Sequence, residues 1–124
     1  MVSVSSFGIE VSDLARAGEL YTKAFGLSVA FTIDNDTIEE IALNDGAGGP
    51  SILLMRTKAM PPPGPEPKTG KVVLLTDDVV ALYAAAVAAG ATSEREPAVY
   101  PGTSYTIGMV RDFDGNLVEM IEAG

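Results

Sequence analysis

The chain has 124 residues, with 17 acidic against eight basic side chains, and it contains no cysteine, histidine or tryptophan. A chain of this length buries one core without disulfides, and the missing Cys and His exclude thiolate nucleophiles, imidazole bases and metal sites that need those ligands. The formal net charge of −9 argues against nucleic acid and anionic membranes as partners and favours neutral or cationic ligands, although it also serves solubility.

The start of the chain does not resemble a targeting signal. The segment MVSVSSFGIEVSD lacks the basic flank and the long apolar stretch of a signal peptide, and no apolar run elsewhere is long enough to cross a bilayer. We therefore expect a soluble, cytoplasmic protein that does not enter membranes.

The first predicted elements lie in residues 7–31, FGIEVSDLARAGELYTKAFGLSVAF. Apolar residues alternate at the start of this segment, which predicts a strand, and then recur at helical spacing between Asp13 and Gly26. Aspartate is a common helix N-cap and glycine a common helix end, so both limits of the helix are indicated. One face of the helix is apolar, as expected for a helix that lies on a sheet.

Residues 71–94 repeat this plan, with Asp77 or Asp78 as the cap and Gly90 as the helix end. Short apolar runs after each helix predict three further strands in each half, namely 27–33, 37–44 and 51–56, then 91–95, 103–111 and 117–122. Each half therefore reads as β-α-β-β-β.

The two halves are separated by a proline-rich stretch, residues 57–70, which holds five of the eight prolines. Proline fixes φ and removes a hydrogen-bond donor, so this stretch is predicted to be a stiff linker. We expect one domain, residues 1–124, built from modules 1–56 and 71–124. One helix cannot cover both faces of a sheet, so the two sheets should pair. The predicted class is α+β, with a cupped, mixed and mostly antiparallel sheet and the helices outside.

The chain closes with RDFDGNLVEMIE, in which a polar turn, residues 112–116, leads into an apolar strand that carries Glu119. Together with the duplicated plan and the opening VSDLARAGELYTKAFGL, this segment resembles the vicinal oxygen chelate superfamily, which includes glyoxalase I, bleomycin-resistance proteins and extradiol dioxygenases. The resemblance covers essentially the whole chain, with Phe113 where many members have proline. It implies the fold described above and a cavity inside the cup.

In metal-dependent members of that superfamily, four side chains inside the cup bind the metal. The resemblance implies that three of these places are Ser6, Lys71 and Glu119 in this sequence. The fourth is either Leu53 or Leu54. Only Glu119 keeps a ligand side chain, because serine is a poor ligand, lysine repels a cation and leucine has no lone pair. We therefore expect no bound metal and no other cofactor.

Strand alternation predicts which side chains line the cup. If Glu119 faces the cup, Leu117 and Ile121 share its face. Strand 103–111 has two possible phases, one with Thr106, Gly108 and Val110 inward, and the other with Tyr105, Ile107 and Met109 inward. We expect a ligand to contact Ser6, Glu10, Phe31, Leu53, Lys71, Tyr100, Tyr105, Phe113 and Glu119.

Several of these residues have a second interpretation. Glu119 either contacts a ligand, pairs with Lys71 across the sheet or acts as a proton-transferring base. Glu10 lies near the end of its strand and is either a solvated rim charge or a ligand partner. The predicted aromatic contacts either stack on a planar ligand or belong to the core.

Taken together, the residues favour a metal-free binding protein over an enzyme. The resemblance to bleomycin-resistance proteins implies that its ligand is a small organic molecule, antibiotic-like or natural-product-like and cationic or planar aromatic. Superfamily members of this length imply a cavity built by two copies, and a hydrophobic content of 47% with a mean hydropathy of +0.24 predicts apolar surface that a homodimer would cover, side by side or with exchanged modules. The alternative is a glyoxalase-like lyase or isomerase, or a dioxygenase-related enzyme, with Glu119 as base or metal ligand.

Overall fold

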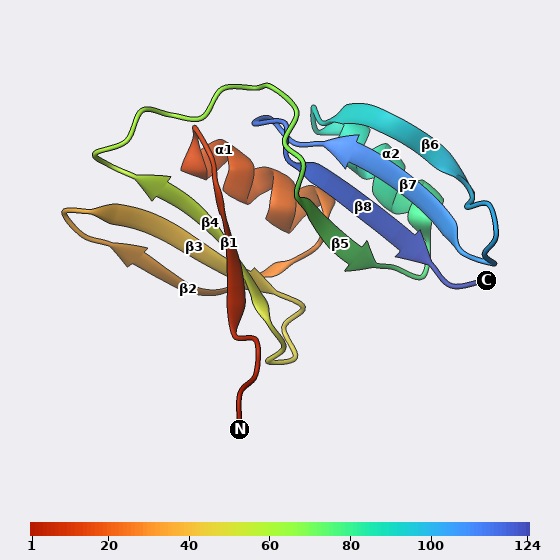
Figure 1. Ribbon diagram of the computed structural model, residues 1–124, viewed down its shortest axis with the longest axis horizontal. Helices are drawn as coiled ribbons and strands as arrows, with labels where there is room; N and C mark the ends of the chain where they lie inside the picture. The colour runs from red at the N-terminus through yellow and green to blue at the C-terminus, as the bar shows by residue number, and fades with distance from the viewer. The chain divides into compact units, whose positions relative to one another are not determined.

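A computed structural model describes residues 1–124, which divide into two units, residues 1–64 and residues 65–124. Figure 1 shows the strands and helices of both units with their labels. The border between the units falls inside the proline-rich stretch 57–70 that we interpreted as a linker. No helix is both long enough and apolar enough to span a bilayer.

The first unit is a four-stranded mixed sheet with one helical segment. Its elements are β1 (Ser6–Glu10), α1 (Leu14–Glu19), η1 (Leu20–Ala24), β2 (Ser28–Asp34), β3 (Ile38–Asn44) and β4 (Ser51–Thr57). The strand order is β1-β4-β3-β2, in which β1 and β4 are parallel and the other pairs antiparallel. The Asp13 carboxylate caps α1 by accepting from the Arg16 amide at 3.0 Å, and Gly26 ends the helical segment with a φ of 77°.

The second unit repeats the plan. Its elements are β5 (Lys71–Leu75), α2 (Val79–Ala88), β6 (Thr92–Val99), β7 (Thr106–Arg111) and β8 (Leu117–Glu122). The order β5-β8-β7-β6, with β5 parallel to β8, matches that of the first unit. The cap of α2 is Asp78, whose carboxylate accepts from the Ala81 amide at 3.1 Å. The predicted α+β class and the twofold β-α-β-β-β order are confirmed.

The helical segment of the first unit differs from the regular helix that the sequence predicted. Its second part, η1, is a π-helical turn in which the Phe25 amide bonds to the Leu20 carbonyl at 3.2 Å. The Thr22 hydroxyl donates a hydrogen bond to the Gly18 carbonyl at 2.7 Å. In a regular helix this carbonyl would accept from a backbone amide instead. The spacing of apolar residues in the sequence does not reveal where a helix widens locally into a π-helical turn.

Strand β6 departs most from its prediction. The sequence predicted a strand over 91–95, whereas β6 runs over Thr92–Val99 and includes Pro97. Its register with β7 shifts between Ser93 and Arg95 and again between Arg95 and Ala98. Such bulges allow a proline inside a strand. A residue displaced by a bulge does not donate a hydrogen bond to the neighbouring strand, so the amide hydrogen that proline lacks is not required there.

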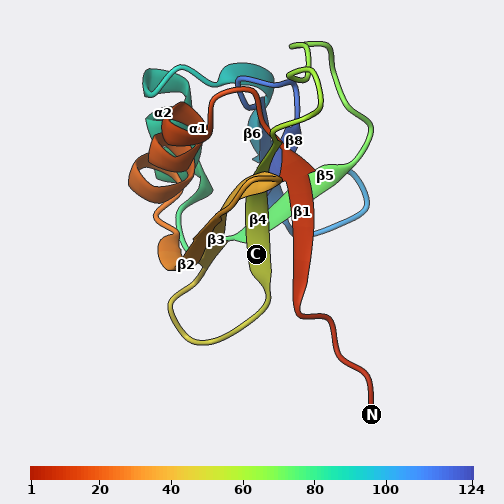
Figure 2. The same cartoon turned by 90° about the vertical axis from the view of Figure 1, so that its left-hand side faces the viewer.

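The core of each unit lies between its sheet and its helix (Figure 2). In the first unit the rings of Tyr21 and Phe25 meet edge to face at 5.0 Å, and Leu54 is fully buried. In the second unit Val118 and Met120 are fully buried on the α2 side of β8. Each fully buried side chain of this size contributes about 1.5–3 kcal/mol to folding. The opposite face of each sheet has no helix of its own and is available for other contacts.

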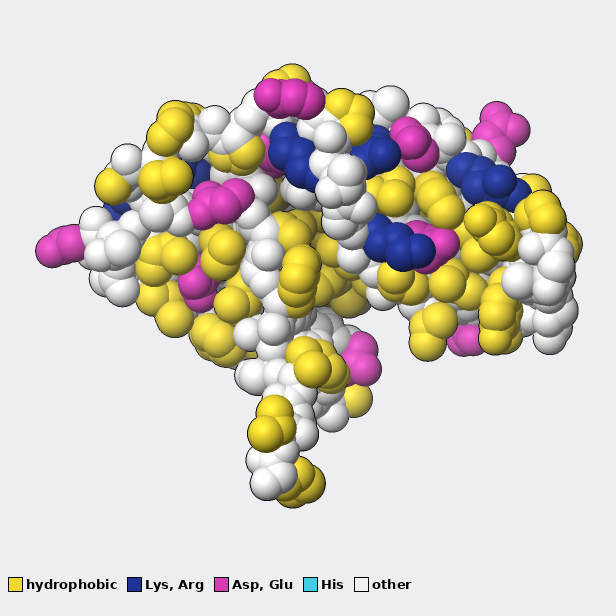
Figure 3. All heavy atoms as spheres, viewed as in Figure 1, with side chains coloured by type: hydrophobic (Ala, Val, Ile, Leu, Met, Phe, Trp, Pro, Cys, Tyr) yellow, Lys and Arg dark blue, Asp and Glu magenta, His cyan; other side chains and the backbone are white.

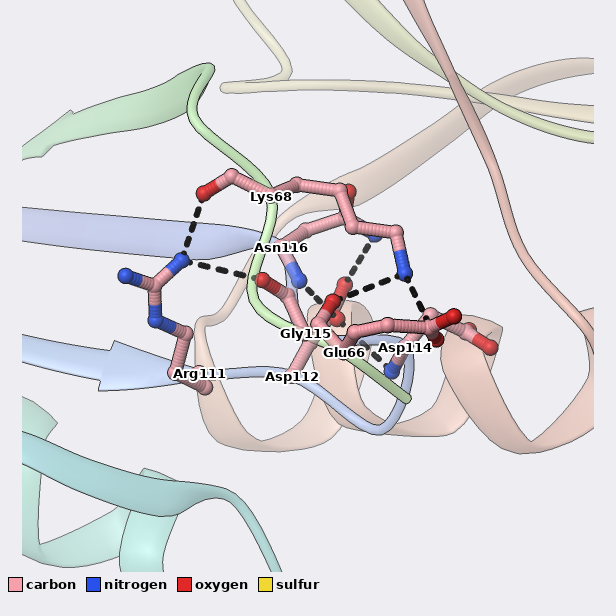
Figure 4. A network of polar contacts seen from close by, with 7 residues as sticks. All are labelled: Glu66, Lys68, Arg111, Asp112, Asp114, Gly115 and Asn116. Carbon is pink, nitrogen blue, oxygen red and sulfur yellow. Dashed lines mark hydrogen bonds and ion pairs between the residues drawn. The ribbon is translucent and has the colours of Figure 1, made fainter. Parts of the chain in front are cut away.

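The turn between β7 and β8 is fastened to the segment that precedes β5 (Figure 4). The Arg111 guanidinium donates to the Lys68 carbonyl at 2.7 Å and to the Gly115 carbonyl at 3.0 Å. Within the turn, the Asp112 carboxylate accepts from the Asn116 amide at 2.9 Å and from the Asn116 side chain at 3.0 Å. These bonds fix the direction in which β8, and therefore Glu119, leaves the turn.

Candidate functional site

A row of side chains crosses the second sheet on the face away from α2. Strand register places Glu119 of β8 between Val73 of β5 and Met109 of β7, and it pairs Met109 with Arg95 of β6. Residues directly opposite each other in a sheet share a face. The site is therefore built on the row Val73, Glu119, Met109 and Arg95.

The register also gives the phase of strand β7, which the sequence left open. Gly108 faces α2, since a Cβ atom added to it would lie 3.5 Å from both Val79 and Tyr83 of that helix. Alternation then puts Ile107 and Met109 on the Glu119 face. Of the two phases, the one with Tyr105, Ile107 and Met109 is the one present.

Glu119 is held in an ion pair with Lys71. The Lys71 ammonium lies 2.9 Å from Oε2 of Glu119, and the side chains are 49% and 8% exposed respectively. The buried carboxylate is thus compensated by a cation that reaches in from the surface. The pairing that we considered as one interpretation of Glu119 exists in the structure, and it leaves the outer side of Lys71 open to a ligand.

Arg95, at the far end of the row, has no partner of opposite charge. Its guanidinium lies over the Tyr100 ring, 5.2 Å from the ring centroid, in a cation–π contact. Its Nε atom is buried and has no hydrogen-bond acceptor. The sequence prediction missed this residue, because the two bulges of β6 break the alternation that would have shown which face it occupies.

The remaining predicted residues of the second unit divide into two places. Tyr100 and Tyr105 flank the turn between β6 and β7, where the Tyr100 amide donates to the Tyr105 carbonyl at 2.9 Å, and both rings are partly exposed. Phe113 instead lies beside Gly90 at the end of α2, where a Cβ atom on that glycine would be 3.1 Å from the ring. Phe113 is therefore at the helix end and outside the Glu119 row.

In the first unit the corresponding row consists of Gly8, Leu53, Ala42 and Phe31. Leu53 has the same position in β4 that Glu119 has in β8, since both are third in their strand and pair with the third residue of the parallel neighbour. Leu54 lies on the helix side and is fully buried, whereas Leu53 lies on the opposite face. The row is apolar, and the Phe31 side chain is half exposed.

The two polar residues predicted for the first unit lie on β1. Ser6 opens the strand and is exposed. Glu10 closes it and is half-buried, and its carboxylate accepts hydrogen bonds from the Thr57 amide at 3.3 Å and from the Thr57 hydroxyl. Glu10 therefore ties the ends of β1 and β4 together.

These residues do not fit a catalytic metal. In the first unit, the places that the resemblance implied for metal ligands hold Ser6 and either Leu53 or Leu54, which offer one weak donor between them. In the second unit Glu119 is the sole donor, and the Lys71 ammonium already lies at its carboxylate. No group of three or more Asp or Glu side chains gathers anywhere in the structure in a way that could hold an ion. A divalent transition metal needs about three or four good donors in fixed geometry, which neither unit provides.

A hollow with a volume of about 430 Å³ adjoins the Glu119 face. It is lined by Leu75, Thr76, Asp77, Ile121, Glu122 and Ala123. Leu75 and Ile121 pair across β5 and β8, two residues beyond Val73 and Glu119 on the same face. Figure 3 shows hydrophobic side chains over this sheet with basic and acidic groups among them. The face thus offers apolar contact area beside a few charged groups, a composition typical of small-molecule sites.

Comparisons with known proteins agree with this architecture. The family described as Glyoxalase/Bleomycin resistance protein/Dioxygenase superfamily matches residues 3–120. No curated protein matches the chain in sequence. Among solved structures, glyoxalase I from Zea mays is 24% identical with a TM-score of 0.85, and the match covers 98% of this chain and 45% of the maize chain. This chain therefore spans about half the length of that enzyme.

Two similar structures have nearly the same length as this chain. TnmS3, an antibiotic binding protein from Streptomyces sp. CB03234, is 23% identical with a TM-score of 0.77, over 100% of this chain and 98% of its own. TioX from Micromonospora sp. ML1 is 20% identical with a TM-score of 0.71, over 99% and 100% respectively. At such identities the matches establish the fold.

Proposed function

We propose that this chain, which belongs to the Glyoxalase/Bleomycin resistance protein/Dioxygenase superfamily, binds and sequesters a small planar organic molecule without using a metal. The observation that carries the proposal is the Lys71–Glu119 ion pair, in which an ammonium group lies at the one inherited carboxylate. A carboxylate already neutralised in this way is a poor metal ligand. It remains suited to orient a polar group of a ligand.

The surroundings of that pair support a binding role. Val73 and Met109 flank Glu119 with apolar surface, and methionine adapts to ligands of different shape. Tyr100 and Tyr105 add partly exposed rings at one edge of the sheet, where a planar compound can stack. The other predicted contacts are positions still to be tested, namely Ser6, Glu10, Phe31 and Leu53 in the first unit and Phe113 at the end of α2.

The similar structures support the choice of ligand class. TnmS3 is an antibiotic binding protein, and it matches this chain over almost its whole length. The maize enzyme, in contrast, is about twice as long as this chain. We therefore propose an antibiotic-like or natural-product-like aromatic compound as the ligand.

We further propose that two copies of the chain form the cavity. The sheet faces that have no helix of their own carry exposed apolar side chains, among them Phe31 and Ile33 in the first unit and Val73 and Leu75 in the second. Exposed apolar area on this scale is typical of interaction surfaces. A homodimer would cover part of it and leave the remainder to a ligand.

The experiment that tests this function is a thermal-shift screen on protein dialysed against a chelator. Planar aromatic compounds and divalent metal salts are compared side by side, because any molecule that binds only the native state raises its melting temperature. We expect a rise with one or more planar compounds and none with metals. A rise with Zn²⁺, Ni²⁺, Mn²⁺ or Fe²⁺, or aromatic binding that requires one of them, would contradict the proposal and favour a glyoxalase-like or dioxygenase-related enzyme.

A further inference from the structure

Arg95 differs from the other cations of the second sheet face. Lys71 is matched by Glu119 at 2.9 Å, and Arg111 is matched by Glu94 at 3.2 Å. Arg95 forms no ion pair and no hydrogen bond, although it is half-buried. Its only polar contact is with the π-face of Tyr100.

A half-buried arginine without an acceptor is costly to the protein. Buried donors are almost always satisfied, and an orphaned donor such as Nε of Arg95 calls for a physical explanation. The guanidinium is planar and presents several donors in a fixed fork that matches a carboxylate. The Tyr100 ring holds the Arg95 guanidinium in place. The side chain is therefore already ordered, and a ligand loses less binding free energy in fixing it.

From this geometry we infer that Arg95 binds an anionic oxygen, a carboxylate or phenolate, of an aromatic ligand. The inference rests on the proposed binding function and adds the chemistry of the ligand. Arg95 lies in the same row as Met109 and Glu119, so a flat molecule that places its anionic oxygen at Arg95 can extend its rings over Met109 toward the Lys71–Glu119 pair.

The net charge of the whole chain does not oppose this ligand. The formal charge is −9, from which the sequence favoured neutral or cationic compounds. At physiological ionic strength, however, exposed charges more than about 8 Å apart are largely screened. The groups nearest the ligand therefore decide the preference, and the nearest uncompensated charge on this face is that of Arg95.

The test uses three naphthalene derivatives of the same size and different charge, titrated calorimetrically into the full chain. They are naphthoate, its neutral methyl ester and naphthylmethylammonium. The parent is compared with Arg95→Gln, with Arg95→Lys and with Lys23→Gln, which removes an exposed cation from the first unit as a matched control. We expect the parent to prefer naphthoate, and Arg95→Gln to bind it about tenfold or more weakly, the size of a charge-assisted hydrogen bond.

Two further results are expected. Arg95→Lys should recover only part of the affinity, because it keeps the charge and loses the fork. Lys23→Gln should bind within about twofold of the parent, because the exposed Lys23 charge is already paired with Glu19 and is screened by solvent. Arg95→Gln should melt at close to the parent temperature, because relief of the unsatisfied Nε donor offsets the loss of the contact with the Tyr100 ring.

The outcomes separate the two claims. If the parent binds the ester or the ammonium compound at least as well as naphthoate, or if Arg95→Gln keeps the naphthoate affinity, the role of Arg95 is refuted while the binding function stands. If the parent binds none of the three and also no planar compound in the thermal-shift screen, the proposed function fails, and this inference fails with it.

Discussion

At the scale of single residues, the Lys71–Glu119 pair is the feature that the fold alone does not explain. The first unit has Leu53 at the position of Glu119, and its sheet forms with the same order and register. An apolar residue is therefore compatible with this point of the sheet, whereas a buried carboxylate costs free energy unless it is paired. The proposed recognition of a ligand gives this charged pair a role that folding of the sheet does not require.

A double-mutant cycle tests the coupling of the pair. Lys71→Met leaves the Glu119 carboxylate buried and unpaired, and we expect it to lower the free energy of unfolding by about 1–2 kcal/mol, less than for a fully buried pair because Lys71 is half exposed. Adding Glu119→Leu should recover most of that loss. Urea unfolding gives the free energy of unfolding of the parent, of each single variant and of the double variant. If the effects of the two substitutions on that free energy simply add, the two groups are not coupled.

At the scale of elements, the turn between β7 and β8 connects three parts of the second unit. Gly115 has a φ of 76°, and a Cβ atom on it would lie 2.3 Å from the Glu66 carbonyl oxygen. Glycine is thus required both by the backbone conformation and by the close approach of the segment before β5. The polar residues of this turn serve to orient β8.

The two requirements on Gly115 can be separated by comparison with Gly26. Gly26 has a similar φ of 77° but no atom within 4 Å of an added Cβ. Gly26→Ala should therefore cost about 1 kcal/mol of stability, the penalty for a left-handed alanine, whereas Gly115→Ala should cost about 2 kcal/mol or more. Chemical denaturation measures both, and equal losses would mean that the approach of Glu66 carries no energetic weight.

At the scale of the whole molecule, one plan is used twice with different surfaces. The helix side of each sheet is packed with fully buried apolar residues, such as Leu54 in the first unit and Met120 in the second. On the other side, the central row of the first sheet is apolar and includes the half-exposed Phe31, whereas the second sheet carries Lys71, Glu119 and Arg95. The two units thus share a buried core on the helix side and differ in the side chains of their open faces.

Sedimentation equilibrium tests the proposed homodimer. We expect a mass of twice 12.9 kDa at micromolar concentration. Phe31→Ser should raise the dissociation constant by about tenfold or more, because burial of a phenylalanine is worth about 1.5–3 kcal/mol. Val80→Ser, which removes an exposed apolar side chain from α2, should leave it unchanged. A parent chain that sediments as a monomer would refute the dimer.

Most of the fold could be predicted because its signals are local. Asp13, Gly26 and Gly90 mark helix ends through their own backbone preferences, and alternation in β8 correctly grouped Glu119 with Leu117 and Ile121. The π-helical turn, beside which the Thr22 hydroxyl bonds to the Gly18 carbonyl, was not predictable from apolar spacing.

The site was harder to predict because it depends on register. The choice between Leu53 and Leu54 and the phase of β7 each required the pairing of neighbouring strands. Arg95 was missed because the bulges in β6 shift it relative to a regular strand. The sequence also gave no sign that the Phe113 ring, which we predicted to contact a ligand, lies beside Gly90 at the end of α2.

The most direct test of metal-independent binding at the Glu119 face is a chemical-shift titration by nuclear magnetic resonance. Isotope-labelled protein in a chelating buffer is titrated with the planar compound that gives the largest thermal shift. We predict that the backbone amides of Lys71, Arg95, Met109 and Glu119 shift together and saturate, while amides along α2 move little. Shifts confined to other parts of the chain, or shifts that appear only after a divalent metal is added, would contradict the account.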